Sequence, residues 1–223
     1  MRPGLTGWAQ INGRNDQSWD DRFRLDVWYV EHRSLRLDLA ILAVAVRLSM
    51  GSPVFWRQER SGKDGRPFSL AKIRTMRPAG PGEDGPERDE IRLTPLGRVL
   101  RAASLDELPS LWNVLVGDLS LVGPRPLPVR YRDRYSAEQA RRLDVRPGLT
   151  GWAQISGRND QSWGERFRLD LWYVENRSLR LDLLILLRTP LQVLRRRGIA
   201  QPGHATMPEF TGETDRAEHA GGA

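Results

Sequence analysis

Two adjacent acids, Asp106 and Glu107, lie in a stretch of the chain that also carries basic and proline-rich elements. A carboxylate that acts as a nucleophile on a phosphate needs access to its substrate and cations close by. The candidates to supply those cations are Lys72, Arg74, Arg98 and Arg101. Guanidinium groups bind phosphate oxygens in a bidentate manner, whereas Lys acts as a point charge. These residue types therefore point to phosphate chemistry at an acidic residue.

The spacing of Ser104 and Glu107 allows a second interpretation, because it is the spacing of a capping box at the start of a helix. Acids in a first helical turn are favoured by the helix dipole, so the pair could be only an N-terminal signature. Pro109 opposes this interpretation. In a helix capped by Ser104 the amide of residue 109 would bond to the carbonyl of Leu105, and proline has no amide hydrogen. The helix would then begin kinked, or only near Pro109, which leaves the acids at an irregular entrance.

The composition limits the partners and the chemistry. The 223 residues include 35 Lys and Arg against 28 Asp and Glu, and the pI is about 10.6, so phosphates or an anionic membrane surface are expected partners. No motif of a nucleic-acid-binding module accompanies this charge, so nucleic acid is not an expected partner. The absence of cysteine excludes disulfides, thiolate catalysis and Cys-ligated zinc, and the three scattered His residues suggest no metal cluster.

The elements that must position these residues can be read from local patterns. Residues 54–59 and 67–73 are typical of two strands joined by a glycine-rich turn at 62–65. Apolar residues at helical spacing predict amphipathic helices over 22–32 and 166–176.

Helix starts and a loop are also marked in the sequence. Thr94 followed by Pro95 predicts the start of a helix, with a capping side chain and a residue that needs no amide donor. Ser136 and Gln139 have the spacing of a capping box. Residues 77–90 combine Pro and Gly with charged residues, which predicts a mobile loop.

Two apolar segments, 39–46 and 183–187, are too short to span a membrane, and no run of eighteen apolar residues occurs in the chain. Each is compatible with a core helix or with a helix that lies in the membrane interface, flanked by Arg47 in one case and by 195–197 in the other. The N-terminus lacks the apolar core of a signal peptide.

A long segment of the chain occurs twice. Residues 2–42 align with residues 146–186, and only six positions differ. Solenoids stack three or more units of about 20 to 50 residues end to end, whereas about a hundred unrelated residues separate these two copies. The repeat is therefore a duplication and not a repeat array.

Three long blocks, residues 51–76, 93–128 and 146–186, resemble in order the bacterial sugar transferases that are monotopic polyprenyl-phosphate phosphoglycosyl transferases. The resemblance covers about residues 43–190. It implies transfer of a sugar phosphate from a UDP-sugar to a polyprenyl phosphate such as undecaprenyl phosphate, with release of UMP. Such a reaction initiates the assembly of exopolysaccharide or another glycoconjugate.

The same resemblance implies roles for individual residues. Asp106 is the implied nucleophile, which attacks the donor diphosphate and holds the sugar phosphate covalently, with Glu107 beside it. Mg²⁺ is the implied cofactor, with these two acids as its ligands. The implied substrate-binding residues are Lys72, Arg74, Arg101, Pro124, Arg125, Pro126 and Asp170.

Family members begin with a hydrophobic helix that enters the membrane, breaks at a Ser-Pro element and returns to the same face. Residues 43–58 resemble the returning half and the strand after it, and we expect residues 2–42 to replace the entering half. The resemblance implies a peripheral or monotopic enzyme at the cytoplasmic face of the bacterial inner membrane.

Together, these observations predict an α+β protein: a helix-rich single catalytic domain around a small sheet, with amphipathic interfacial helices. We expect a duplicated copy over 1–42, the catalytic domain over 43–200 and a disordered tail over 201–223. The intact catalytic blocks favour an active enzyme that uses a UDP-sugar and a polyprenyl phosphate at the membrane. The incomplete membrane element favours a catalytically impaired remnant that binds a nucleotide sugar or a partner transferase. The sequence leaves a homo-oligomer open.

Overall fold

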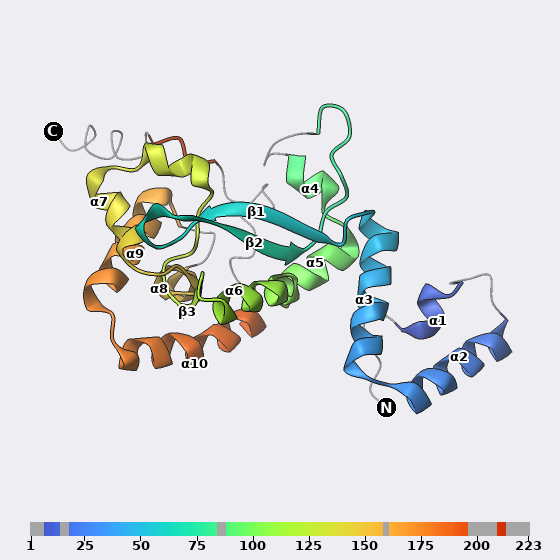
Figure 1. Ribbon diagram of the computed structural model, residues 1–223. Helices are drawn as coiled ribbons and strands as arrows, with labels where there is room; N and C mark the ends of the chain where they lie inside the picture. Colours follow the sequence, from blue (N-terminus) through green and yellow to red (C-terminus); the bar gives the residue numbers. More distant parts are fainter. Residues whose placement is uncertain (1–6, 14–17, 84–87, 158–160, 196–208, 213–223) are drawn as a thin grey trace. The chain divides into compact units, whose positions relative to one another are not determined.

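The computed structural model describes residues 7–13, 18–83, 88–157, 161–195 and 209–212 (Figure 1). The chain divides into two compact units, Met1–Val54 (unit 1) and Phe55–Ala223 (unit 2). The expected junction between the duplicated copy and the catalytic domain, at residues 42 and 43, lies inside one helix of unit 1, Leu35–Met50.

The described part of unit 1 contains the helices α1 (Trp8–Ile11), α2 (Trp19–His32) and α3 (Leu35–Met50). The hydroxyl oxygens of Ser18 and Ser34 cap α2 and α3, because each accepts a hydrogen bond from the amide three residues further on. The short α1 contacts both longer helices, and Trp8 stacks on Trp28 with their ring centroids 5.0 Å apart. The helix predicted over 22–32 is confirmed as part of α2.

Unit 2 begins with the predicted hairpin. Strands β1 (Phe55–Ser61) and β2 (Pro67–Ile73) pair antiparallel, and the 3₁₀ turn η1 (Lys63–Gly65) joins them. The two strands and the glycine-rich turn are therefore confirmed. The hairpin crosses unit 2 above η3 and α6 in the view of Figure 1.

The next elements are α4 (Asp89–Arg92), α5 (Pro95–Ala102), the 3₁₀ segment η3 (Leu105–Ser110) and α6 (Leu111–Leu115). The predicted start of α5 is confirmed, since the Thr94 hydroxyl accepts a hydrogen bond of 3.0 Å from the Gly97 amide. Gly97 also permits a close approach of α5 to the chain after β2. A Cβ atom at this position would lie 1.9 Å from the Thr75 carbonyl oxygen.

The predicted loop over 77–90 is confirmed only in part. Residues 77–83 form neither helix nor strand, and Arg77 donates hydrogen bonds of 2.6 and 2.7 Å to the two carboxylate oxygens of Glu83. The structure begins α4 at Asp89, so the end of the predicted loop is helical, while residues 84–87 lie outside the described part of the chain.

The sequence predicted one small sheet, and unit 2 contains a second one. Strands β3 (Ser120–Val122) and β4 (Gly148–Thr150) pair in parallel, joined by the connecting segments η4 (Val129–Arg134), α7 (Ala137–Ala140) and η5 (Arg141–Asp144). The capping box of Ser136 and Gln139 is confirmed at the start of α7. Gly148 has no room for a side chain, because a Cβ atom would lie 2.1 Å from the Gly123 amide nitrogen. The α+β class is confirmed, with two small two-stranded sheets instead of one.

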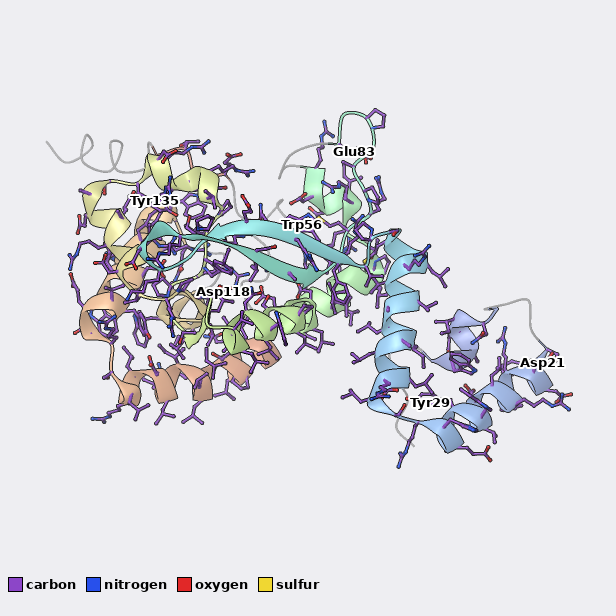
Figure 2. All side chains as sticks on the ribbon, in the orientation of Figure 1. Asp21, Tyr29, Trp56, Glu83, Asp118 and Tyr135 are labelled. Carbon is purple, nitrogen blue, oxygen red and sulfur yellow. The ribbon has the colours of Figure 1, made fainter. Side chains whose placement is uncertain are left out.

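The second copy of the repeat continues from β4 into α8 (Trp152–Ser156), α9 (Trp163–Asn176) and α10 (Leu179–Arg195). The helix predicted over 166–176 is confirmed as part of α9. Trp163 and Phe167 of α9 are buried in an aromatic cluster whose other members are Leu127, Tyr131 and Phe210, with Tyr135 packed against it. Tyr135 lies near α7 on the same side of unit 2 as α9 (Figure 2).

Phe210 corrects the expectation of a disordered tail from residue 201 onward. Its side chain is fully buried in the aromatic cluster, and Arg134 donates a hydrogen bond to its carbonyl oxygen. Residues 209–212 are therefore held by unit 2, because an aromatic side chain fills a space between η4 and α9. The remainder of the expected tail lies outside the described residues.

The two apolar segments belong to α3 and α10, and each helix buries only part of its surface. Val46 in α3 and Ile185 in α10 are fully buried. Exposed apolar side chains on these helices are Leu35, Leu39, Val44 and Leu48 of α3, and Leu179, Leu183, Leu184, Leu187 and Leu191 of α10. Within the described ranges, no helix has the length and apolar character needed to cross a membrane.

The two copies repeat the same local structure in different surroundings. The Trp8–Trp28 ring pair of unit 1 corresponds to Trp152–Trp172 in unit 2, with centroids 4.9 Å apart. Six residues of α9 are buried, whereas none of α2 is. Local sequence therefore fixes the helices, and the surrounding chain decides which faces are covered.

This contrast predicts unequal costs for one substitution at two matched positions. Phe167→Ala removes a ring that is 2% exposed and should lower the free energy of unfolding of unit 2 by about 3–5 kcal/mol. Phe23→Ala removes the corresponding ring of α2, which is 61% exposed, and should change stability by less than about 0.5 kcal/mol. Urea unfolding of both variants measures this difference, and equal losses would contradict the burial described for α9.

Candidate active site

The acid pair lies on η3, in a conformation that decides between the two sequence interpretations. Ser104 adopts a left-handed conformation with φ of 56°, and its side chain makes no capping hydrogen bond. Leu105–Ser110 forms a 3₁₀ segment that contains Pro109. The capping-box interpretation is therefore wrong, and the irregular entrance expected from Pro109 is confirmed. The physical reason is the missing amide hydrogen of proline, which an α-helix capped by Ser104 would require.

Side chains next to the acid pair attach η3 and α6 to β2. The Ser110 hydroxyl donates to the Ala71 carbonyl oxygen at 3.0 Å, and the Asn113 amide donates to the Ser69 carbonyl oxygen at 3.0 Å. Both side chains are buried. These bonds bring the acids close to Lys72, which is the next residue of β2.

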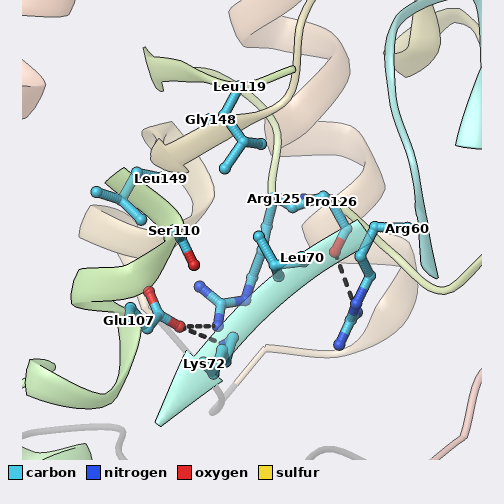
Figure 3. Close-up of a pocket in the computed structure, with 10 residues that line it drawn as sticks. All are labelled: Arg60, Leu70, Lys72, Glu107, Ser110, Leu119, Arg125, Pro126, Gly148 and Leu149. Carbon is cyan, nitrogen blue, oxygen red and sulfur yellow. Dashed lines mark hydrogen bonds and ion pairs between the residues drawn. The ribbon is translucent and has the colours of Figure 1, made fainter. Parts of the chain in front are cut away.

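Glu107 is held by two cations. Its Oε1 atom lies 2.7 Å from Nζ of Lys72 and 2.6 Å from Nη2 of Arg125 (Figure 3). Burial by itself would raise the pKa of Glu107, but the charges and hydrogen bonds of Arg125 and Lys72 outweigh it and hold that pKa well below its ordinary value. Glu107 is therefore ionised and immobilised.

Asp106 has a different environment. It is 8% exposed, and its carboxylate forms no hydrogen bond or ion pair with the residues that the structure describes. Burial raises the pKa of Asp106, and the charge of Lys72 opposes that rise. Arg101 and Arg125 are also close enough to favour the ionised form. Asp106 is thus a carboxylate near several cations but bound to none of them.

Arg125 is positioned through the backbone of its own segment. The Gly148 amide donates to the Pro124 carbonyl oxygen at 2.9 Å, and Arg60 donates to the Pro126 carbonyl oxygen at 3.1 Å. Arg142 donates to the carbonyl oxygen of Arg125 itself at 2.7 Å. The Pro124–Pro126 segment is fixed along its length, which directs the Arg125 guanidinium at Glu107.

Asp170 completes this support. It is 1% exposed, and its Oδ2 atom lies 2.7 Å from Nη2 of Arg142. The implied substrate-binding residue Asp170 is thus behind the Pro124–Pro126 segment, where it neutralises Arg142.

A small pocket lies between β2, η3 and the Pro124–Pro126 segment. Its charged lining residues are Arg60, Lys72, Glu107 and Arg125 (Figure 3). The structure thus brings together Lys72, Glu107, Arg125 and Pro126 from the expected set, with Asp106 adjacent on η3.

Four other residues singled out in the sequence are placed elsewhere. Arg101 on α5 donates from Nε to the Thr75 hydroxyl at 2.9 Å, and only its charge acts on Asp106. Arg74 follows β2 and is not among the pocket-lining residues, and the exposed Arg98 lies on the outer side of α5. Pro124 does not line the pocket, and its carbonyl oxygen accepts the hydrogen bond from the Gly148 amide.

Sequence reasoning missed Arg60 and Arg142. Arg60 is at the turn end of β1, opposite Phe68, and nothing in its spacing marks it. Arg142 is one of two adjacent arginines, and the sequence does not distinguish the buried Arg142 from the half-exposed Arg141. A buried arginine requires an acidic partner. The one signal in the sequence for a buried arginine was therefore Asp170, the acid that pairs with Arg142.

The acid pair fits Mg²⁺ in one coordination mode only. The described residues contain no group of three or more His, Cys, Asp or Glu side chains that could hold a metal. In proteins Mg²⁺ is commonly bound by one or two carboxylates together with substrate phosphates and water. Asp106 and Glu107 suit this mode, since among the described residues none binds the Asp106 carboxylate and Glu107 is bound only through Oε1.

Comparison with known proteins identifies the family of this chain. A profile of the family described as bacterial sugar transferase matches residues 1–47 and, separately, residues 39–196. The chain belongs to the bacterial sugar transferase family. This membership confirms the expected resemblance and the expectation of an enzyme. Since residues 1–47 match the family on their own, the first copy of the repeat is also sequence of this family.

Individual sugar transferases are similar over most of this chain. The protein named uncharacterized sugar transferase EpsL from Bacillus subtilis is 54% identical over 170 residues, which are 76% of this chain and 84% of that protein. The UDP-glucose:undecaprenyl-phosphate glucose-1-phosphate transferase of Caulobacter vibrioides is 45% identical over 68% of this chain and 60% of that protein. The exopolysaccharide production protein ExoY of Rhizobium meliloti is 40% identical over 73% of this chain and 79% of that protein.

The support of Arg125 predicts unequal effects at two adjacent arginines. Arg142→Met leaves the buried carboxylate of Asp170 without its partner and should lower the free energy of unfolding by about 3–5 kcal/mol. Arg141→Met removes an exposed ion pair with Glu175, where a loss of about 0–1 kcal/mol is expected. Urea unfolding of the two variants gives both values. A loss below about 1 kcal/mol for Arg142→Met would contradict the supporting role of this ion pair.

Proposed function

We propose that this protein transfers a sugar phosphate from a UDP-sugar to a polyprenyl phosphate, with undecaprenyl phosphate as the acceptor and UMP as the second product. The name of the Caulobacter relative specifies this kind of transfer, and the name of the Rhizobium relative assigns that protein to exopolysaccharide production. The observation that carries the proposal is the buried carboxylate of Asp106, which has no ion-pair partner among the described residues, beside a Glu107 that two cations immobilise.

In the proposed first step, a carboxylate oxygen of Asp106 attacks the phosphorus that bears the sugar. The new bond joins that oxygen to the phosphorus, and the bond to the bridging oxygen breaks, so UMP leaves with the electron pair. In the second step an oxygen of the polyprenyl phosphate attacks the same phosphorus and displaces the Asp106 carboxylate. Splitting the transfer into two displacements is the established advantage of a covalent nucleophile.

The environment of Asp106 suits this role. Because no described residue forms a hydrogen bond or an ion pair with its carboxylate, the lone pairs are available for attack. The guanidinium of Arg125 and the ammonium of Lys72 line the pocket, and positive groups there would neutralise phosphate oxygens. Their bonds to Glu107 hold them in place before the substrate binds.

Replacing the nucleophile tests the proposal directly. Asp106→Asn should lower the rate of UMP release by at least about 10³-fold, because an amide is a poor nucleophile. Asp133→Asn, at an acid that is 86% exposed, is the matched control and should behave as the parent protein. The assay uses purified protein, several UDP-sugars and polyprenyl phosphate in detergent. UMP release by Asp106→Asn near the parental rate would contradict the covalent role, and no release by the parent would support an impaired remnant.

We also propose that Mg²⁺ is required, with Asp106 and Glu107 as its protein ligands and substrate phosphates completing the coordination. A bound Mg²⁺ supplies positive charge that offsets repulsion between the donor diphosphate and a carboxylate nucleophile. Lys72 and Arg125 keep Glu107 ionised, which would favour its binding of a metal ion.

Removal of divalent cations gives the corresponding prediction. Excess EDTA should abolish UMP release, and added Mg²⁺ should restore it. Ca²⁺ should restore activity poorly, because its larger and more variable coordination sphere does not impose octahedral geometry. Full activity in excess EDTA would contradict the metal requirement.

Membrane association is the remaining part of the proposed function. The exposed leucines of α10, together with Leu111, Trp112 and Leu115 of α6, give unit 2 apolar surface for an interface at the cytoplasmic face of the bacterial membrane. The exposed Arg188 on α10 supplies positive charge for anionic headgroups, and the side chains of residues 195–197 lie outside the described residues. We propose a peripheral attachment that combines apolar contact with electrostatic attraction.

A salt wash of membranes tests this attachment. At 1 M salt the screening length falls to about 3 Å, so most of the protein should leave the membrane without detergent. Leu187→Asn should weaken binding to anionic vesicles, since this side chain is 73% exposed on α10. Ile91→Asn, at a 58% exposed position of α4, is the matched control. A protein that resists salt and requires detergent would contradict a peripheral attachment.

A further inference from the structure

Among the described residues of unit 1, none covers one face of α2. Trp19, Phe23 and Val27 lie on this face and are 72%, 61% and 56% exposed. Three large apolar side chains on one helix face form a continuous patch, because they are spaced four residues apart. Patches of this kind in soluble proteins commonly mark interaction surfaces.

The structure also shows what covers the same face when it occurs in α9. We define the α9-binding surface as Tyr131, Tyr135, Arg142 and Phe210. The Phe210 ring centroid lies 5.3 Å from that of Trp163 and 5.1 Å from that of Phe167, and Tyr135 meets Phe167 edge-on at 5.6 Å. Arg142 pairs with Asp170 at 2.7 Å. Aromatic contact and one buried ion pair thus hold α9.

The residues of α9 that make these contacts all recur in α2. Trp163, Phe167 and Asp170 correspond to Trp19, Phe23 and Asp26 after a shift of 144 positions. Asp26 is exposed and has no ion-pair partner among the described residues, so α2 also offers the charge that Arg142 requires. The one change among the buried apolar positions is Leu171, which is Val27 in α2.

We propose that the exposed face of α2 docks on the α9-binding surface of a second copy of this chain, in exchange for the α9 helix of that copy. Exchange of an equivalent element between two copies is a low-cost route to association, because the incoming helix restores the interactions that the departing helix made. Loss of about one methylene from Leu to Val should weaken docking of α2 roughly fourfold relative to α9.

Two properties of the exchanged state follow. Asp26 takes the place of Asp170 beside Arg142, so the carbonyl oxygen of Arg125 keeps its hydrogen bond and the site remains supported. The α9 helix of each chain is covalently attached close to its own binding surface, which gives it a high effective concentration. Exchange is therefore a minor state in dilute solution and increases with protein concentration.

Site-directed crosslinking tests the exchange in the full chain. The sequence has no cysteine, so one introduced thiol per chain is unique. Arg141 lies beside the α9-binding surface and contacts Glu175 at 3.0 Å, and Glu31 is the counterpart of Glu175 in α2. Mixing Glu31→Cys and Arg141→Cys chains with a short bismaleimide should give a heterodimer of about twice 25.4 kDa, linked between residues 31 and 141.

Two comparisons decide the outcome. Arg24→Cys replaces the donor thiol in the control mixture, because the corresponding Arg168 is 78% exposed and faces away from the α9-binding surface. Adding Phe23→Ala to the Glu31→Cys chain should lower the heterodimer yield at least about tenfold, and it does not threaten the fold because Phe23 is exposed. A yield no higher than the Arg24→Cys control, or one unchanged by Phe23→Ala, would overturn the proposal.

The buried ion pair offers an independent measurement. Asp170→Asn in the Arg141→Cys chain weakens α9 and leaves Arg142 in need of a carboxylate, so the heterodimer yield should rise at least about fivefold. Asp26→Asn in the Glu31→Cys chain should cancel that rise. A yield that responds to neither substitution would show that Asp26 does not reach Arg142. None of these measurements uses turnover, so their result is independent of the proposed activity, and circular dichroism verifies that each variant is folded.

Discussion

The arrangement of unit 2 depends on one carboxylate oxygen. Oε1 of Glu107 accepts hydrogen bonds from Lys72 and from Arg125, which come from segments far apart in the sequence. Burying any of these three charges alone would be costly, and together they compensate one another. The three charges compensate one another only if they are held close together. This need explains why η3 is attached to β2 and why the Pro124–Pro126 segment is fixed by hydrogen bonds to its backbone. A second layer, the pair of Arg142 and Asp170, holds that segment from behind.

The same cluster gives two adjacent acids opposite properties. Glu107 is held by two cations, which keep its pKa low, whereas burial raises the pKa of Asp106 and no residue in the described part of the chain binds it. In many active sites, two neighbouring carboxyl groups have different roles because their environments differ. Pro109 contributes to this division, because it prevents a regular helix capped by Ser104 and leaves the acids on a 3₁₀ segment.

The duplicated segment separates local from long-range causes. In both copies a serine caps the long helix, a tryptophan pair packs inside the copy, and a tyrosine bonds to an aspartate nine residues further on. These interactions lie within the repeated sequence, so they form in both surroundings. Burial of the outer face differs, since only α9 meets the aromatic cluster that includes Phe210. The two copies therefore share their secondary structure, but only the second copy has its outer face buried.

The sequence alone determined the features that depend on neighbouring residues: the hairpin, the helix caps at Thr94 and Ser136, the aromatic helices and the irregular backbone before Pro109. These follow from side-chain spacing and from donors that proline lacks, so they can be read without knowing the fold. Tertiary structure alone decided the parallel pairing of β3 with β4, the burial of Phe210, the placement of Arg60 in the lining of the pocket and the placement of Arg142 behind it. Each of these features joins residues that are distant along the chain, and no local pattern records which distant partner a strand, a ring or a charge will meet.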